Sequence, residues 1–385
     1  MGSGGAVSAG GGRGGVSVYA LAFHADYRCH NSGACCTAHW DVPVELPVYK
    51  SLSEAVSSGV LNPADTSAGI YPFIVESDLP DAAAAILERD DDGRCVFYAN
   101  ASKRCIVHRD LGEAALPATC RHFPRISVQD ARGTFVSLSH FCPTAASMLF
   151  RDVPVEIVAK PPAFPSVDYD GLVVTADDLP PMLTPRMLMD FDGYAAWERH
   201  MVARFADVHR PPVSVVATVR RDAELLTEWK PGSTSIAAAV ARLPREYVDL
   251  QEDGGLSGTL RRFAEVIAAV PYDLKPSADE DGLETPMREY VQPAWAAFHA
   301  PINRYLSAKA FASWTAYQGR GIRTIVRGIE AALALVRVEA SRQCRNAQRM
   351  LDAALLLEAI RQTDFLLNHL AVAEELAKAW SVVEK

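Results

Sequence analysis

The sequence predicts a mainly α-helical protein that carries a small, irregular α+β domain rich in cysteine on its N-terminal side. Seven of the eight cysteines fall between residues 29 and 142, where short apolar runs alternate with turns and prolines. From residue 186 onward the apolar residues instead recur at helical spacing over long stretches. The two patterns predict a cysteine-rich domain of short elements followed by a C-terminal α-helical domain.

Four segments are expected along the chain. A glycine-rich leader at 1–16 precedes a cysteine-cluster metal-binding domain at 17–150, a proline-rich linker at 151–185 and the helical domain at 186–385. The leader has no apolar core of the kind found in signal peptides. No strand precedes its glycines, as a phosphate-binding loop would require. We therefore expect it to be disordered.

The elements of the cysteine-rich domain are expected to be short. Apolar runs predict extended segments at 16–23, 70–75, 95–98 and 105–112, and a β-hairpin made by 126–128 and 134–139. Helical segments are expected at 47–60, 81–87 and 144–150, whereas the prolines of 117–124 predict a fixed loop. The helices expected beyond the linker are 186–208, 213–229, 234–243, 256–270, 287–305, 308–338 and 346–380.

The composition limits the class of protein. A net charge of -9 and an isoelectric point near 5.6 argue against a protein that binds nucleic acid through its bulk charge. No stretch approaches the roughly 20 apolar residues that span a membrane. We therefore expect a cytoplasmic protein without nucleic-acid or membrane partners. In a reducing cytosol, clustered cysteines are more often metal ligands or redox groups than disulfides.

The clustered cysteines are the candidate metal ligands, and the cofactor that they predict is an iron–sulfur cluster or zinc. They are Cys29, Cys35, Cys36, Cys95, Cys105, Cys120 and Cys142. Seven thiols exceed the four ligands of one site, so either there are two sites or some cysteines have redox or structural roles. Because Cys35 and Cys36 are adjacent, one tetrahedral ion is difficult for both to reach. The isolated Cys344 is expected to be a buried free thiol.

The residues around these cysteines have less specific expected roles. His30 follows Cys29 directly and His122 lies two residues after Cys120; both are expected to be supporting or surface residues rather than ligands. Arginines that would either offset thiolate charge or form surface ion pairs are Arg104, Arg109, Arg121 and Arg125. The aromatic residues expected to pack around the site are Trp40, Phe97 and Phe123.

These motifs resemble those of the bacterial cysteine-cluster proteins described as zinc- or iron-chelating. The opening Cys-x-x-Cys-x-x-Cys-Cys signature of that family reads here Cys29-His-Asn-Ser32-Gly-Ala-Cys35-Cys36. Further pieces are Cys105-Ile-Val-His-Arg-Asp-Leu-Gly112, Cys120-Arg-His-Phe-Pro-Arg125 and Ser137-Leu-Ser-His-Phe-Cys142-Pro. Within the family the chain is most similar to the flagellin lysine N-methylase branch. The similarity covers residues 17–150 and is looser at Tyr305-Leu and Arg361-Gln-Thr-Asp-x-Leu-Leu.

The resemblance implies a metal or iron–sulfur site built by the cysteines. For the methylase branch it implies methyl transfer from S-adenosylmethionine to lysine side chains of flagellin or another protein substrate. Ser32 replaces the second cysteine of the signature, and serine is a poor substitute for a thiolate. Neither a Gly-x-Gly methyl-donor fold nor a radical adenosylmethionine motif accompanies the resemblance, and no catalytic residue is assigned.

Three functions therefore remain open from the sequence. The first is a cytoplasmic metal- or iron–sulfur-binding protein. The second is a protein-lysine N-methyltransferase built on the same scaffold. The third is a helical interaction module whose zinc is purely structural.

Overall fold

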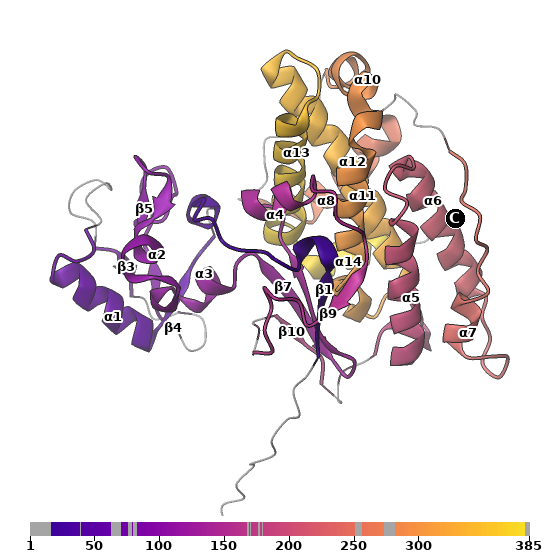
Figure 1. Cartoon of the computed structure of the whole chain (residues 1–385), viewed down its shortest axis with the longest axis horizontal. Coiled ribbons are helices and arrows are strands. Elements are labelled where there is room, and N and C mark those ends of the chain that lie inside the picture. Colours follow the sequence, from indigo (N-terminus) through magenta and orange to yellow (C-terminus); the bar gives the residue numbers. More distant parts are fainter. Residues whose placement is uncertain are drawn as a thin grey trace, which may run out of the picture.

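The computed structural model describes residues 17–38, 40–62, 71–75, 79, 83–167, 169, 171–175, 178, 180–250, 256–272 and 282–381. The predicted glycine-rich leader lies outside these residues. Helices dominate the described chain and its sheets are small, which confirms the predicted fold class. Figure 1 shows a part built of short elements on one side, a helical body on the other, and a sheet between them.

The central sheet has five strands in the order β10-β7-β8-β1-β9. Strand β1 pairs in parallel with β8, and β7 and β8 form an antiparallel hairpin, which confirms the hairpin predicted from the sequence. The strands are β1 (Val18–Leu21), β7 (Arg125–Asp130), β8 (Gly133–Leu138), β9 (Ile157–Ala159) and β10 (Leu172–Val173). Strands β9 and β10 come from the predicted linker, which therefore contributes to the sheet that β1 begins. The predicted domain boundaries themselves remain a prediction.

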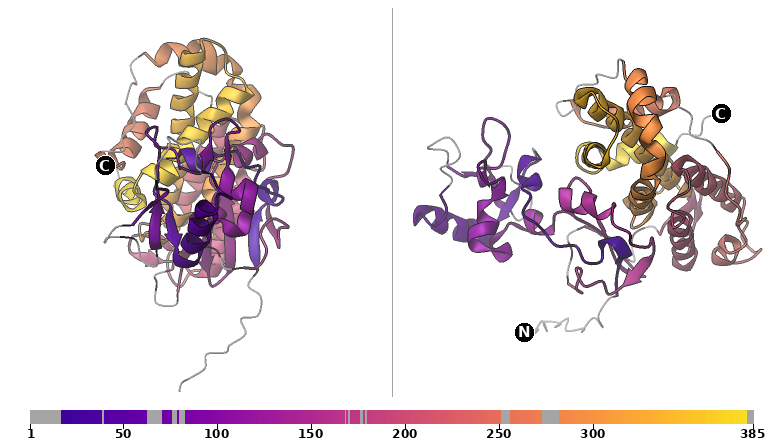
Figure 2. Two further views of the ribbon diagram at one scale, coloured as in Figure 1. Left: turned by 90° about the vertical axis from the view of Figure 1, so that its left-hand side faces the viewer. Right: turned by 45° about the horizontal axis from the view of Figure 1, so that its top comes forward.

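The cysteine lobe, which we define as residues 29–122, leaves the sheet after β1 and returns to it at β7. Its own apolar core includes Leu52, Phe73 and Phe97. The elements are β2 (Pro43–Glu45), α1 (Leu46–Ser57), β3 (Phe73–Ile74), β4 (Ala83–Leu87), β5 (Tyr98–Ala99), β6 (Arg104–Cys105), α2 (Ile106–Leu111) and α3 (Ala118–His122). The right-hand view of Figure 2 shows this lobe beside the sheet rather than among the helices of the body.

The helical body is organised around α12, which is buried along most of its length and contacts α6, α8, α11, α13 and α14. Its helices are α4 (Pro143–Met148), α5 (Phe191–Arg204), α6 (Pro212–Thr227), α7 (Ile236–Val240), α8 (Ser257–Ala268), α9 (Glu284–Pro286), α10 (Gln292–Trp295), α11 (His299–Ala310), α12 (Ile322–Ala347), α13 (Ala353–Phe365) and α14 (Ala373–Ser381). A two-stranded ribbon of β11 (Met182–Thr184) and β12 (Met187–Leu188) precedes α5. Among the described residues, no helix is both long enough and apolar enough to cross a membrane.

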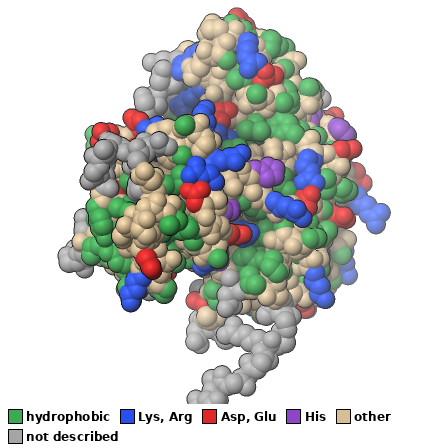
Figure 3. Space-filling view, turned by 60° about the vertical axis from the view of Figure 1, so that its left-hand side comes forward, with side chains coloured by type: hydrophobic (Ala, Val, Ile, Leu, Met, Phe, Trp, Pro, Cys, Tyr) green, Lys and Arg blue, Asp and Glu red, His purple; other side chains and the backbone are tan. Residues whose placement is uncertain are grey.

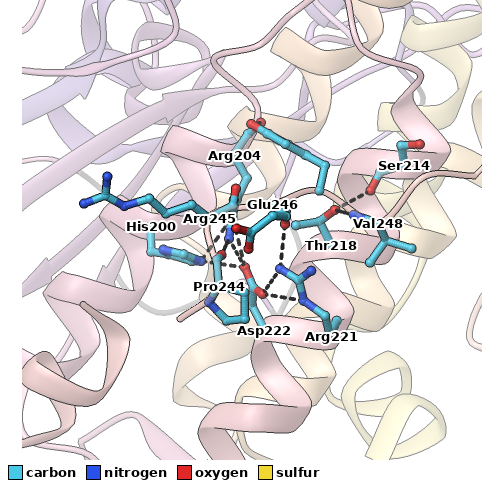
Figure 4. A network of polar contacts seen from close by, with 11 residues as sticks. His200, Arg204, Ser214, Thr218, Arg221, Asp222, Pro244, Arg245, Glu246 and Val248 are labelled. Carbon is cyan, nitrogen blue, oxygen red and sulfur yellow. Dashed lines mark hydrogen bonds and ion pairs between the residues drawn. The ribbon is translucent and has the colours of Figure 1, made fainter. Parts of the chain in front are cut away.

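A buried carboxylate holds the segment after α7 against α5 and α6 (Figure 4). Asp222 on α6 accepts hydrogen bonds from Arg204 Nε at 3.0 Å and Arg221 Nη2 at 2.7 Å, and His200 Nε2 lies 2.7 Å from it. Arg204 also donates to the carbonyl of Arg245 at 2.8 Å. Because the guanidinium group of Arg204 donates both to the Asp222 carboxylate and to a backbone carbonyl of the loop, the network fixes this loop to the helical body.

Several predicted elements are wrong. Residues 83–87 form strand β4 between β2 and β3 rather than a helical turn, and most of 105–112 is helix α2 rather than an extended segment. The predicted loop 117–124 contains helix α3. The predicted helix 308–338 is interrupted after Ala310 and resumes at Ile322 as α12, which runs on to Ala347. A π-turn at 366–370 separates α13 from α14 within the predicted helix 346–380.

Candidate metal centre

Five of the predicted ligands meet in the core of the cysteine lobe. Cys36 and Cys95 are buried there, and Cys35, Cys105 and Cys120 pack against the same cluster as partly buried residues. Cys35 and Cys36 share one turn, and the other three come from separate short elements or turns. The lobe therefore brings together residues that are as much as 85 positions apart in the sequence (35 to 120).

The turn that carries Cys35 and Cys36 is held by its backbone. Gly33 begins it with φ at +71°, and a Cβ at this position would lie 2.5 Å from Cε2 of Tyr98. Only glycine fits such a close approach in a left-handed conformation. The turn is then fixed to the next cysteine, because Cys95 donates its amide N–H to the carbonyl of Cys36 at 2.8 Å. Cys105 is placed beside this turn by its pairing with Tyr98 across β5 and β6.

The Cys36 thiol is the centre of the group. It forms hydrogen bonds with the thiols of Cys105, Cys35 and Cys95, which raise its pKa well above the ordinary value. The same bond from Cys36 lowers the pKa of Cys105 to about 7. Burial, followed by the nearby Cys35, Cys95 and Cys105, raises the pKa of Cys120. Cys105 is thus the thiol most easily converted to a thiolate, the form in which sulfur binds metals.

Glu45, at the end of β2, supplies an oxygen to this group. Its Oε1 accepts the amide N–H of Ala118 at 3.0 Å, which holds the first turn of α3 and hence Cys120. Its Oε2 is buried without a hydrogen-bond partner among the described residues. The carboxylate is also close enough to Cys120 to raise the pKa of that thiol. Buried carboxylate oxygens are nearly always paired or bound to a cation, so this atom fits a metal site.

The other two predicted ligands lie at the edge of the lobe toward the sheet. Cys142 is buried at the start of α4, and its sulfur lies 3.7 Å from the hydroxyl of Tyr27. Cys29 is exposed, and its sulfur accepts a hydrogen bond from the backbone N–H of Asn31 at 3.4 Å. The charges of Cys142 and Cys35 both contribute to raising the pKa of Cys29, after the larger effect of burying its sulfur. Cys29 is therefore near both Cys142 and Cys35.

The thiols do not converge on one point. Among the residues that the structure describes, no set of three or more His, Cys, Asp or Glu side chains has the arrangement of a formed metal site. The sulfurs instead satisfy one another as hydrogen-bonded thiols around Cys36. A metal would therefore require these side chains to rotate from mutual contact toward a shared centre. The donor set itself, soft sulfurs with one carboxylate, suits zinc or iron.

The remaining predicted residues are placed as follows. Phe97 is in the lobe core, whereas Trp40 and Phe123 pack on each other and on His369 at the border with the helical body. Cys344 is buried in the core around α12, as expected. Of the candidate arginines Arg104, Arg109, Arg121 and Arg125, Arg109 forms an ion pair with Asp110. The flanking histidines are His30 and His122.

A second buried group joins the segments that carry the looser resemblance. Asp364 on α13 accepts the amide N–H of His140 at 2.5 Å and the hydroxyl of Tyr305 at 3.1 Å, and pairs with Lys309. His140 in turn faces His24. Sequence reasoning missed both Asp364 and Glu45, because a single carboxylate on a helix or strand end has no local signature.

Comparisons with family models, with curated proteins and with solved structures find no match to this chain. The candidate function therefore depends on the geometry above and on the resemblance of the motifs.

Proposed function

We propose that the chain is a protein that binds a thiophilic metal ion or an iron–sulfur cluster in the cysteine lobe. The observation that supports this most directly is the contact of the buried Cys36 thiol with Cys35, Cys95 and Cys105. Cys120 and the unpaired oxygen of Glu45 adjoin them. Free thiols in such contact are chemically suited to hold a soft cation as thiolates.

The roles of the residues follow from their positions. Cys105, the most acidic of these thiols, is the first expected to bind as thiolate, and Cys36 is its nearest partner. Glu45 both holds α3 in place and offers an oxygen ligand. When bound, the metal would add folding free energy to a lobe built of two- to five-residue strands and short helices.

The test is metal analysis of the full chain purified without oxygen. Broad absorbance at about 400 nm would identify an iron–sulfur cluster, and colourless protein with one or more zinc ions would identify a zinc site. Cys36→Ser and Cys105→Ser should lose at least half of the bound metal, whereas Cys344→Ala should lose none. Circular dichroism dominated by the helical body separates metal loss from global unfolding. Protein that holds neither metal after reconstitution with iron and sulfide or with zinc would refute the proposal.

Methyl transfer to protein lysines, with S-adenosylmethionine as donor, stays a prediction from the resemblance alone. Mass spectrometry of a co-expressed flagellin would detect it as added methyl groups on lysine. Unmodified flagellin beside metal-loaded protein would leave the binding function in place and remove the enzymatic one.

A further inference from the structure

A cavity of about 520 Å³ lies where the cysteine lobe, the sheet and the helical body meet. Figure 3 shows the surface hollowed at this border, with histidine side chains among hydrophobic, Lys and Arg side chains. The size is within the range of about 300–1,000 Å³ that small-molecule sites occupy. Trp40 of the lobe and Phe123, directly after it, form one side of the cavity, α11 and the loop after it provide another, and α14 a third.

Aromatic rings form part of the walls. The rings of Trp40 and Phe123 lie 5.3 Å apart, and the ring of His369 lies 4.7 Å from Trp40. Phe311 and Trp314 follow α11 on the opposite wall. Burial lowers the pKa of His369 to about 4, so this ring is neutral at physiological pH. Flat apolar faces without charge suit a ring system as the occupant.

The floor of the cavity is the helix-facing side of the hairpin. Ile126 and Ser137 are directly paired across β7 and β8, and both line the cavity. Because side chains alternate along a strand, Ser137 shares its face with Phe135, which packs on Phe311. Arg125, on the other face of β7, also lines the cavity, and its guanidinium carbon lies 6.0 Å from the ring of Tyr27. The hydroxyl of Ser137 has no hydrogen-bond partner among the described residues.

A cationic group at the cavity is the ammonium of Lys309. Its side chain is 15% exposed, lines the cavity and pairs with the fully buried Asp364. An ammonium has three N–H donors, and Asp364 is the one acceptor found for it in the described part of the chain. Asp364 also accepts hydrogen bonds from His140 and Tyr305. Lys309 therefore has donors left for an acceptor that enters the cavity.

We propose that this cavity binds a small molecule with a flat apolar ring system and one carboxylate, the ring between Trp40, Phe123 and Trp314 and the carboxylate on Lys309. The hydroxyl of Ser137 is the second donor to the carboxylate. The site is separate from the cysteine group and does not depend on a bound metal. It adjoins that group through α3, because Thr119 and His122 line the cavity on either side of Cys120.

The proposal is tested with two probes of similar size. Calorimetry and tryptophan fluorescence measure the binding of each probe to the full chain. Naphthalene-2-carboxylate should saturate the protein, and naphthalene-2-methanol should bind at least tenfold more weakly. Leu367→Trp, which fills the cavity, should abolish binding of both probes. Tyr272→Ala, at a residue that is 91% exposed and outside the cavity, should change neither.

Removal of Lys309 alone would leave Asp364 buried and unpaired, so the informative variant is the double change Lys309→Met with Asp364→Asn. The asparagine oxygen can accept the amide N–H of His140, and its NH2 group can donate to the hydroxyl of Tyr305, which bonds the other carboxylate oxygen in the unmodified chain. The variant should bind both probes equally. Saturation by neither probe at millimolar concentration would overturn the proposal. Equal binding of both probes to the unmodified chain, or a preference that survives the double change, would overturn it as well.

Discussion

The Nε2 atoms of His24 and His140 lie 3.1 Å apart, and both side chains are fully buried. Burial, opposed by Asp364 and assisted by Lys309, lowers the pKa of His140 to about 4. Burial, His140 and Lys309 place the pKa of His24 well below its ordinary value. The pair is therefore neutral in the folded protein, with one ring donating to the other.

This pair predicts that the protein loses stability as pH falls from about 6.5 toward 4. In that range the unfolded chain protonates both histidines while the folded chain does not, so protons favour unfolding. For His140 the loss is about 2 kcal/mol between pH 7 and pH 5, and His24 adds to it in the same direction. Urea unfolding at several pH values measures it. The double variant His24→Gln with His140→Gln should have a smaller slope with pH, and an unchanged slope would contradict the prediction.

Replacement of Arg132 by methionine should destabilise the fold strongly. Its guanidinium donates to Glu198 at 2.8 Å and to Asp130 at 2.7 Å, and both carboxylates are buried. The variant leaves two buried negative charges without their partner, which costs about 3–5 kcal/mol. The exposed ion pair of Arg323 with Glu224 is the matched comparison, and Arg323→Met should cost less than about 1 kcal/mol. Similar urea midpoints for the two variants would disprove the difference.

Glu45→Gln should weaken metal binding without unfolding the lobe. The amide oxygen of glutamine still accepts the N–H of Ala118, but the group can no longer bind a cation as a carboxylate. We expect an affinity lower by about tenfold to a hundredfold and altered visible absorption of the cobalt-substituted protein. Glu54→Gln, at an exposed position of α1, is the control. Equal cobalt affinities and spectra in the two variants would exclude Glu45 as a ligand.

The sequence predicted the class of fold because its signals are local. Helical periodicity marks the body, and the turn between two β-rich runs marks the hairpin of β7 and β8. Strand β4 was missed because an alanine-rich segment favours helix by itself, whereas here it is paired on both sides by β2 and β3. Helix α3 was missed because Pro117 and Pro124 lie just outside its two ends rather than within it.

The candidate site was predictable only in part for the same reason. Cysteines are few and their clustering is visible in the chain, so the thiols were found. The bond from Ala118 to Glu45 spans 73 positions and the one from His140 to Asp364 spans 224. Such contacts depend on how the lobe and the body fold, and no spacing in the sequence records them.

Gly33→Ala should reduce metal binding more than it reduces global stability. An added Cβ would lie 2.5 Å from the Tyr98 ring and 2.9 Å from the carbonyl of Lys103, in a backbone conformation that alanine disfavours. The turn carrying Cys35 and Cys36 must then move away from β5 and β6, which hold Cys105. Gly59→Ala is the matched control, since Gly59 has a similar φ of +76° and no atom within 4 Å of the added Cβ.

Zinc or iron content per chain, measured beside the urea midpoint, separates the two effects of these variants. Both substitutions introduce the same backbone strain, but only the one at Gly33 displaces thiols. We expect the Gly33 variant to lose most of its metal and the Gly59 variant to keep it at a comparable midpoint. Equal metal content in both would mean that the position of this turn does not control the site, and that Cys35 and Cys36 are not among its ligands.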